Sequence, residues 1–342
     1  MKGGGHSSHL TMKYDGSPAV VFGHNPENGK FFVASKSAFN KNPKLNYTHE
    51  DVVKNHGHAP GLMDKLHSAL NHLKKVAPKT GVYQGDLMYS EGDKNEHKGG
   101  VSFTPNTITY TAKGDMADKI RRSKLGVIVH TKYEGKDIKT MGAVPHPDLH
   151  NFSQHPDVWH RSANHDTKHV HYSDSDEAKF HEHMVAAKRI NDVHKKEMYK
   201  VTEPHRGEGG HLETYINHTV RTGEEPSVPG LKKHIQGKYD KSAAKLKTPA
   251  GKSKRSQEAK SHMLHIDANK EHYNNMFNMH QHLQKAKNVL VKHLETHEGG
   301  LEHHIEGKKS KPEGFVVHHA NEPTKLVNRA EFARANLLKV RK

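Results

Sequence analysis

Residues 11–22 read Thr-Met-Lys-Tyr-Asp-Gly-Ser-Pro-Ala-Val-Val-Phe, and their lysine, Lys13, is the first candidate for chemistry. A free ammonium near pH 7 has no lone pair to donate, so a nucleophilic lysine needs partial burial, nearby cations or a bound metal. Here a polar, Gly-rich segment precedes the lysine and a β-prone segment follows it. Asp15 could orient the amine or hold metal-bound water, and Gly16 lets the backbone come close to a ligand.

A β-hairpin is predicted directly after this stretch. Residues 19–22 and 30–37 are apolar, β-prone runs, and the turn between them ends in Asn28-Gly29. An Asn-Gly pair between two such runs is a strong hairpin signal. The returning strand brings Lys36 back toward the start of the first strand, near Lys13. Two cations are therefore predicted at one edge of the sheet.

Further cations and acids follow in three later segments. Residues 81–89 read Gly-Val-Tyr-Gln-Gly-Asp-Leu-Met-Tyr, residues 311–317 read Lys-Pro-Glu-Gly-Phe-Val-Val, and residues 325–332 read Lys-Leu-Val-Asn-Arg-Ala-Glu-Phe. They supply Asp86, Glu313 and Lys325. Attack on a triphosphate needs this mixture: cations at the phosphates, acids for Mg²⁺, and a nucleophile placed in line.

The ordered set resembles the motifs of the covalent nucleotidyltransferases, which comprise ATP-dependent DNA ligases, RNA ligases and mRNA-capping guanylyltransferases. Lys13-Tyr14-Asp15-Gly16 is similar to their Lys-x-Asp-Gly motif, whose lysine attacks the α-phosphate of a nucleotide and becomes a lysyl-NMP. The resemblance covers residues 10–135 and 308–342, about half the chain.

The resemblance implies a role for each matching residue. Lys36 stands where RNA ligases carry a basic residue in a Ser/Thr-rich strand, and Lys325 where a lysine grips the α-phosphate. Asp86 would hold the ribose or the metal, in place of the family's glutamate. Glu313 would be a metal or water–metal ligand, and Val316 would pack on the base.

Several positions depart from the family's pattern. Val327 stands where a second lysine is expected, and the spacing from Asn328 to Phe332 is one residue too long. Residues 125–130 read Leu-Gly-Val-Ile-Val-His, without the aromatic side chain that often stacks on the base in ligases, so an aliphatic contact would have to replace it. The gap between Asp86 and Glu313 also exceeds that of most ligases.

The function implied is an ATP-dependent polynucleotide ligase that uses ATP and Mg²⁺ (or Mn²⁺) and joins 5′-phosphate and 3′-hydroxyl ends. An RNA-ligase type is favoured because residues 326–342 leave no room for a C-terminal OB-fold. Two alternatives remain open: a DNA nick ligase, and a basic nucleic-acid-binding protein with an inactive nucleotide pocket. RNA or DNA ends are the expected partners, and the oligomeric state stays open.

Composition agrees with a polyanionic partner. The 342 residues carry a formal net charge of +16, which suits nucleic acid. The chain has no cysteine, which excludes disulfides, thiolate zinc sites and a cysteine nucleophile. No apolar run is long enough to span a membrane and the start of the chain is not apolar, so a cytoplasmic protein without a membrane partner is expected.

The predicted fold class is α+β: a nucleotidyltransferase core of antiparallel sheets with helices, interrupted by a mainly helical insertion. The core would comprise residues 1–144 and 311–342, and the basic insertion residues 145–310. Strands are expected at 82–89, 102–112 and 125–130, with a helix at 62–73. The insertion shows helical patterns at 180–191 and 273–294, separated by a basic, mobile or solvent-facing stretch at 232–260. A last helix is expected at 331–340.

The 35 histidines are the remaining unusual feature. Helical i,i+4 pairs such as His165 with His169 and His293 with His297 could bind a transition metal. No acid or third histidine completes such a site, so a solvated, pH-sensitive surface is the preferred interpretation.

Overall fold

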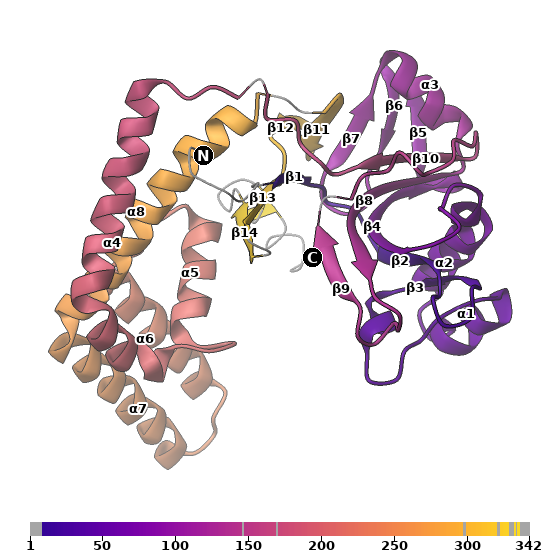
Figure 1. Ribbon diagram of the computed structural model, residues 1–342. Helices are drawn as coiled ribbons and strands as arrows, with labels where there is room; N and C mark the ends of the chain where they lie inside the picture. Colours follow the sequence, from indigo (N-terminus) through magenta and orange to yellow (C-terminus); the bar gives the residue numbers. More distant parts are fainter. Residues whose placement is uncertain are drawn as a thin grey trace. The chain divides into compact units, whose positions relative to one another are not determined.

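The computed structural model describes residues 9–145, 147–168, 170–296, 299–319, 322–327, 332 and 334–335. Within these, the chain forms two compact units (Figure 1). The first, here called the sheet unit, comprises the described residues up to Val170 together with Leu294–Val327. The second, the helical unit, comprises His171–His293 and the described residues beyond Val327. The predicted α+β class is confirmed, with mixed sheets and helices.

The largest sheet of the sheet unit is built on the predicted hairpin. Its strands are β2 (Ala19–His24), β3 (Phe31–Ala34), β4 (Val82–Ser90), β8 (Leu125–Glu134), β9 (Gly142–Pro145) and β10 (Val158–Ser162). The order is β10-β8-β4-β2-β3, and β9 also pairs with β8. All pairings are antiparallel except that of β10 with β8.

Two helices cover this sheet, α1 (His49–His56) and α2 (Pro60–His72). The apolar stripe predicted at 62–73 supplies Leu66, Ala69 and Leu70, which pack against side chains of β2, β4 and β8. Alternate residues of β2, Val20 and Phe22, face this core.

A three-stranded sheet joins the two ends of the sheet unit. It consists of β1 (His9–Lys13), β13 (Gly314–His319) and β14 (Glu322–Val327), in the antiparallel order β1-β13-β14. Lys13 is aligned with Gly314, directly after Glu313. Residues some 300 positions apart in the chain are therefore neighbours in one sheet.

The third sheet has the order β12-β11-β7-β6-β5. Its strands are β5 (Lys94–His97), β6 (Gly100–Phe103), β7 (Thr109–Ala112), β11 (Leu301–Ile305) and β12 (Lys308–Ser310), and α3 (Gly114–Arg122) contacts β6 and β7. The predicted continuous strand at 102–112 is wrong, because a turn separates β6 from β7. Four short 3₁₀ helices complete the described part: η1 (Lys36–Phe39), η2 (Leu73–Lys75), η3 (Glu91–Asp93) and η4 (Glu203–His205).

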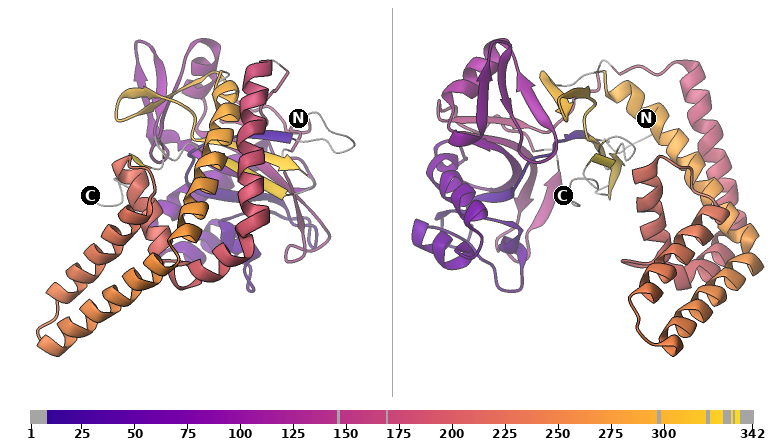
Figure 2. Two further views of the ribbon diagram at one scale, coloured as in Figure 1. Left: turned by 90° about the vertical axis from the view of Figure 1, so that its left-hand side faces the viewer. Right: turned by 180° about the vertical axis from the view of Figure 1, so that it is seen from behind.

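The described part of the helical unit consists of α4 (Asp174–Thr202), α5 (His211–Thr222), α6 (Val228–Ala244), α7 (Pro249–Ala268) and α8 (Lys270–Leu294) (Figure 2). Its core gathers Tyr215, Leu231, Ile235, Ile266 and Tyr273. The helices predicted around 180–191 and 273–294 are confirmed as parts of α4 and α8.

The structure bears on three further sequence expectations. The helical segment is shorter than 145–310, because β10 lies before it and β11 and β12 lie after it within the sheet unit. The stretch 232–260, predicted as mobile or solvent-facing, forms most of α6 and the first part of α7. All of its residues except Ile235 and Ala259 are exposed or half-buried, which agrees with the solvent-facing alternative. Most of the helix predicted at 331–340 lies outside the described residues.

Membrane insertion through a helix has no support in the structure. None of the helices in the described part of the chain combines the length and the apolar composition that a membrane crossing needs.

Candidate functional site

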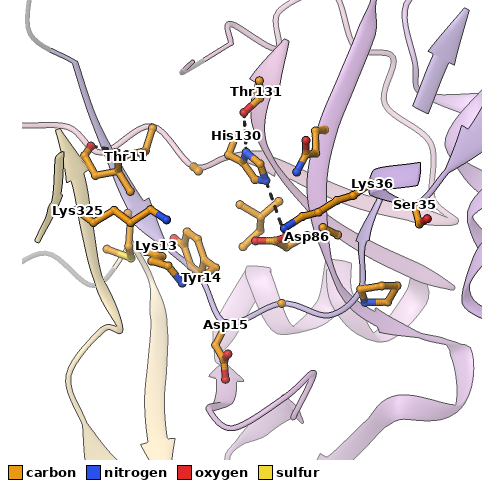
Figure 3. Close-up of a pocket in the computed structure, with 18 of the residues that line it drawn as sticks. Thr11, Lys13, Tyr14, Asp15, Ser35, Lys36, Asp86, His130, Thr131 and Lys325 are labelled. Carbon is orange, nitrogen blue, oxygen red and sulfur yellow. Dashed lines mark hydrogen bonds and ion pairs between the residues drawn. The ribbon is translucent and has the colours of Figure 1, made fainter. Parts of the chain in front are cut away.

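A cavity of about 700 Å³ lies in the sheet unit, lined both by the three-stranded sheet and by the largest sheet (Figure 3). This volume is in the range of small-molecule sites. All but one of the predicted site residues line it: Lys13, Asp15, Lys36, Asp86, Val316 and Lys325. Glu313 is buried directly beside it and contacts Lys13.

The three-stranded sheet turns one face toward the cavity. Thr11, Val316 and Lys325 are aligned with one another across β1, β13 and β14. Since side chains alternate between the two faces of a strand, Lys13 and His318 share this face. All five of these residues line the cavity. Of the alternate residues, Leu10, Phe315 and Leu326 are buried.

Lys13 and Glu313 form an ion pair between Nζ and Oε1. The Glu313 side chain is 5% exposed, and its second oxygen, Oε2, has no hydrogen-bond partner among the described residues. Burial raises the pKa of Glu313 to about 7, although the charges of Lys13 and Lys325 act in the opposite direction. A carboxyl group with this pKa can exchange a proton with its surroundings near neutral pH.

Asp15 has a different role from the predicted one. Its Oδ2 accepts hydrogen bonds from the backbone N–H groups of Thr107 and Ile108 at 2.6 and 2.9 Å, and its Oδ1 accepts one from Asn106 at 2.8 Å. In Figure 3 its carboxylate points away from Lys13. The amine pairs with Glu313 instead, so Asp15 fixes the turn between β6 and β7 rather than orienting the nucleophile.

Gly16, which lines the cavity, also allows close packing against β4. A Cβ atom at this position would lie 2.4 Å from the Cβ of Asp86 and 3.0 Å from the carbonyl oxygen of Leu87. Ser17 donates its backbone N–H to that same oxygen at 2.9 Å. The glycine therefore lets the segment after Lys13 lie directly against β4, which brings Lys13 and Asp86 into one cavity.

Asp86 lies on β4 beside a histidine that the sequence analysis did not assign to the site. His130 Nε2 is 3.8 Å from Asp86 Oδ1, and its Nδ1 is 2.8 Å from the hydroxyl oxygen of Thr131. Desolvation raises the pKa of Asp86 to about 7, and the Glu313 carboxyl adds to this rise. Desolvation and the nearby Lys36 and Lys13 lower the pKa of His130 to about 4, so the ring is neutral at pH 7.

A β-bulge places His130 in the cavity. In the pairing of β4 with β8, Gln84 is aligned with Thr131 but Gly85 is aligned with Val129, so His130 is an extra residue on β8. Bulges often re-aim side chains near functional sites. Ile128, His130 and Thr131 all line the cavity. Ile128 is thus in place for the aliphatic contact expected from residues 125–130.

Lys36 and Lys325 bring positive charge to the cavity from separate elements. Lys36 is the first residue of η1, whose N-terminus is capped by the Ser35 hydroxyl, and it does not continue β3 as predicted. Lys325 lies on β14 next to Val316. Both lysines are exposed residues that line the cavity, so their ammonium groups are accessible to an anionic ligand.

The histidine pairs proposed as metal ligands include His169 and His297, which lie outside the described residues. Within the described residues, no group of three or more His, Asp or Glu side chains has an arrangement that could hold a metal ion. The helical unit nevertheless contains a histidine cluster: His205, His211, His262 and His265 have ring centroids 4.8 to 5.6 Å apart in four pairings.

Acid should destabilise the protein through His205, which is fully buried. Desolvation and the neighbouring histidines lower its pKa to about 4. The unfolded chain, with a pKa near 6.5, binds the proton more tightly, so stability is complete above about pH 6.5 and falls as the pH drops toward 4. Thermal unfolding should show a loss of up to about 2 kcal/mol between pH 6.5 and pH 5 from this group.

A matched pair of variants separates this effect from general acid denaturation. His205→Asn should flatten the pH dependence, because no proton is then taken up at this position on unfolding. His49→Asn, at an exposed position, is the control for the substitution itself. Equal slopes for the wild type and His205→Asn would contradict the assignment.

The family model for a family of unknown function, DUF6267, matches residues 1–341, so the chain belongs to this family. No curated protein and no solved structure matches the chain. The family description names no activity, and the function must be inferred from the cavity itself.

Proposed function

We propose that this protein is an ATP-dependent nucleotidyltransferase of the polynucleotide-ligase type, with Lys13 as the nucleophile. The observation that supports this best is the Lys13–Glu313 ion pair at a cavity that also receives Lys36, Asp86 and Lys325. The ligase-type core would comprise the sheet unit, where the segments that resemble the ligase motifs fold together.

In the proposed first step, Lys13 Nζ attacks the α-phosphorus of ATP. A phosphorus–nitrogen bond forms, the bond from that phosphorus to the bridging oxygen breaks, and pyrophosphate leaves. The attacking amine loses a proton, and Glu313, with a pKa near 7 and direct contact to Nζ, is suited to accept it. Lys36 and Lys325 would neutralise the phosphate oxygens as charge develops.

The later steps transfer AMP to nucleic acid. An oxygen of a 5′-phosphate attacks the phosphorus of the lysyl-AMP, and the lysine amine leaves. A 3′-hydroxyl then attacks the activated 5′-phosphate, AMP leaves, and a phosphodiester bond joins the two ends. RNA ends are the favoured substrate, as in the ligases that the motifs resemble most.

The donor atoms of the cavity fit a divalent cation with oxygen ligands. Magnesium is commonly held by one or two carboxylates, with phosphate oxygens and water completing its shell. Glu313 Oε2 is buried without a hydrogen-bond partner among the described residues, and the Glu313 carboxyl raises the pKa of Asp86, the acid that β4 brings to the same cavity. These two residues would hold Mg²⁺ or Mn²⁺, which would supply charge neutralisation at the triphosphate.

The remaining lining offers surfaces for a nucleoside. Val316 and Ile128 present aliphatic groups from opposite walls, and His130 presents a neutral ring. Gln84 and Thr131 add polar groups on neighbouring strands. Apolar walls with a few polar groups are typical of small-molecule sites.

The test is a pair of labelling reactions with Mg²⁺, followed by denaturing electrophoresis. ATP labelled at the α-phosphate should mark the protein, whereas ATP labelled at the γ-phosphate should not, because pyrophosphate leaves. Absence of any label from a folded wild-type protein, with ATP or GTP, would overturn the proposal. Addition of unlabelled pyrophosphate should remove the label by reversal of the step.

Glu313→Gln should reduce the rate of labelling by about tenfold or more, because the variant loses the proton acceptor beside Lys13 Nζ and a ligand of the cation that would neutralise the triphosphate. Asp86→Asn should reduce it less, since its shorter side chain would act through water. Both acids have a pKa raised to about 7, so they gain charge as the pH rises. The wild-type rate should therefore increase from about pH 6 to pH 8, and less steeply in either variant.

Two alternatives remain. Val327, where the family has a second lysine, is aligned with Gly314, which is itself aligned with Lys13. An apolar side chain thus occupies the position, aligned across the sheet with Lys13, where the ligases have a lysine that contacts phosphate. This substitution favours a nucleic-acid-binding protein with an inactive pocket. ATP binding by calorimetry without labelling would support this function. A preference for nicked duplex DNA over RNA would support a DNA ligase.

A further inference from the structure

The turn that joins α6 to α7 carries a concentrated positive charge. Residues 241–255 contain six basic side chains, and no acid occurs between Asp240 and Glu258. The six are Lys241, Lys245, Lys247, Lys252, Lys254 and Arg255. They occupy the end of α6, the connecting turn and the first two turns of α7. We call residues 241–255 the hairpin tip, and Figure 2 shows it away from the long helices α4 and α8.

The lysines of the hairpin tip are all exposed. None of them makes an ion pair with an acid of the described residues, whereas Arg255 pairs with Glu258 at 2.6 Å. Two lysines elsewhere in the helical unit do form ion pairs with acids. Lys232 pairs with Asp267 at 2.6 Å, and Lys188 with Asp192 one turn away.

The charge at the start of α7 opposes helix stability. The N-terminus of a helix carries partial positive charge and is stabilised by acidic residues in the first turn. α4 follows this rule with three acids in its first turn, whereas α7 has none and places Lys252 and Lys254 near its start. Charged side chains that lower the stability of their own helix, without an ion pair that offsets the loss, indicate a functional surface. The partner must therefore be an anion.

The composition of the tip selects the kind of anion. The residues between the lysines are mostly small, including Ala243, Ala244 and Ser253, which allows an extended partner to approach the backbone. Residues 241–261 contain no aromatic side chain on which bases could stack. Leu246 is the one large aliphatic side chain of residues 241–255 and is half-buried, so the tip lacks the broad apolar face that inserts into a membrane.

We propose that the hairpin tip binds the phosphate backbone of nucleic acid without reading its sequence. The proposal deepens the ligase function, on which it rests for its purpose: the tip would hold the polynucleotide whose ends react. Binding itself requires neither ATP nor Mg²⁺, so it can be measured apart from the chemistry. Phosphate contacts release counterions, and each contributes about 0.9 to the slope of log affinity against log salt for a duplex.

The experiment compares three full-length proteins. The tip variant replaces Lys241, Lys245, Lys247, Lys252 and Lys254 by glutamine. The control variant makes the same five changes on α4, where acids alternate with the lysines: Lys179, Lys188, Lys195, Lys196 and Lys200. Affinity for fluorescent duplex and single-stranded oligonucleotides is measured by anisotropy between about 50 and 200 mM salt, the interval in which phosphate contacts change most.

The tip variant is expected to bind at least about tenfold more weakly than the control, with a salt slope lower by about 3 to 5. Wild-type affinity should be equal for AT-rich and GC-rich duplexes. Circular dichroism should show the same helix content in all three proteins. Labelling by ATP should persist in the tip variant, while joining of strands should fall.

Equal loss of affinity in the tip and control variants would overturn the proposal, because net charge alone would then explain binding. Binding to vesicles with anionic phospholipid headgroups, but not to nucleic acid, would show that the hairpin tip binds membranes and would also overturn the proposal. A wild-type protein that binds nucleic acid through the tip yet never labels with ATP would sink the ligase function and leave the tip proposal standing.

Discussion

Replacement of Lys13 by alanine is expected to abolish covalent labelling by ATP completely. The proposed bond forms at Lys13 Nζ, and no other lysine among the described residues is in contact with the buried Glu313. The loss should exceed the resolution of the assay, at least about a thousandfold, as is common when a nucleophile is removed. Labelling is measured with α-labelled ATP and Mg²⁺ on protein whose fold is verified by circular dichroism.

Lys13→Arg is the matched control for the buried carboxyl. It keeps a cation beside Glu313, but a guanidinium stays protonated and cannot attack phosphorus. Lys13→Arg should therefore fold as the wild type does and remain unlabelled, while Lys13→Ala also leaves a buried acid unpaired. Label that persists in either variant would place the nucleophile elsewhere.

Asp15→Ala is expected to lower the free energy of unfolding by about 3 kcal/mol, because it leaves buried donors without an acceptor. The carboxylate receives two backbone N–H groups and the Asn106 amide, and the residue is 6% exposed. The turn between β6 and β7 would lose its anchor to the segment that carries Lys13. Urea unfolding followed by circular dichroism measures the change.

Asp86→Asn tests whether the effect is specific to Asp15. Asp86 lines the same cavity, but desolvation raises its pKa to about 7, so its ionised form is disfavoured in the folded state. Above pH 7 this acid lowers stability relative to the unfolded chain, and its removal should be neutral or stabilising. A destabilisation by Asp86→Asn as large as that by Asp15→Ala would contradict this assignment of roles.

The sequence predicts the members of the cavity better than their roles. Lys13, Lys36, Asp86, Val316 and Lys325 are found through local motifs, and all five line one cavity. A sequence motif fixes how far apart its side chains are along the chain. Where the motif forms a β-strand, residues two positions apart then point to the same face of the sheet. The order of motifs along the chain therefore carries information about the site.

Contacts between distant segments explain what the sequence leaves out. Asp15 accepts hydrogen bonds from Thr107 and Ile108, which lie in the turn between β6 and β7. From β-propensity alone, this turn is predicted as part of one continuous strand. His130 enters the cavity through a bulge, and strict alternation along β8 cannot reveal an extra residue. Thr11 and His318 could have been found, since each lies two residues from an assigned position on the same face.

The pairing of β1 with β13 has a consequence for the order of events during synthesis. Lys13 leaves the ribosome about 300 residues before Glu313, which corresponds to roughly 15 to 60 s at usual elongation rates. Throughout this interval the nascent chain has the nucleophile but lacks the acid beside it and the strand that holds it. Under the proposed function, chains released early would be unable to react with nucleotide, because the reaction would require β13 and Glu313 to have been synthesised.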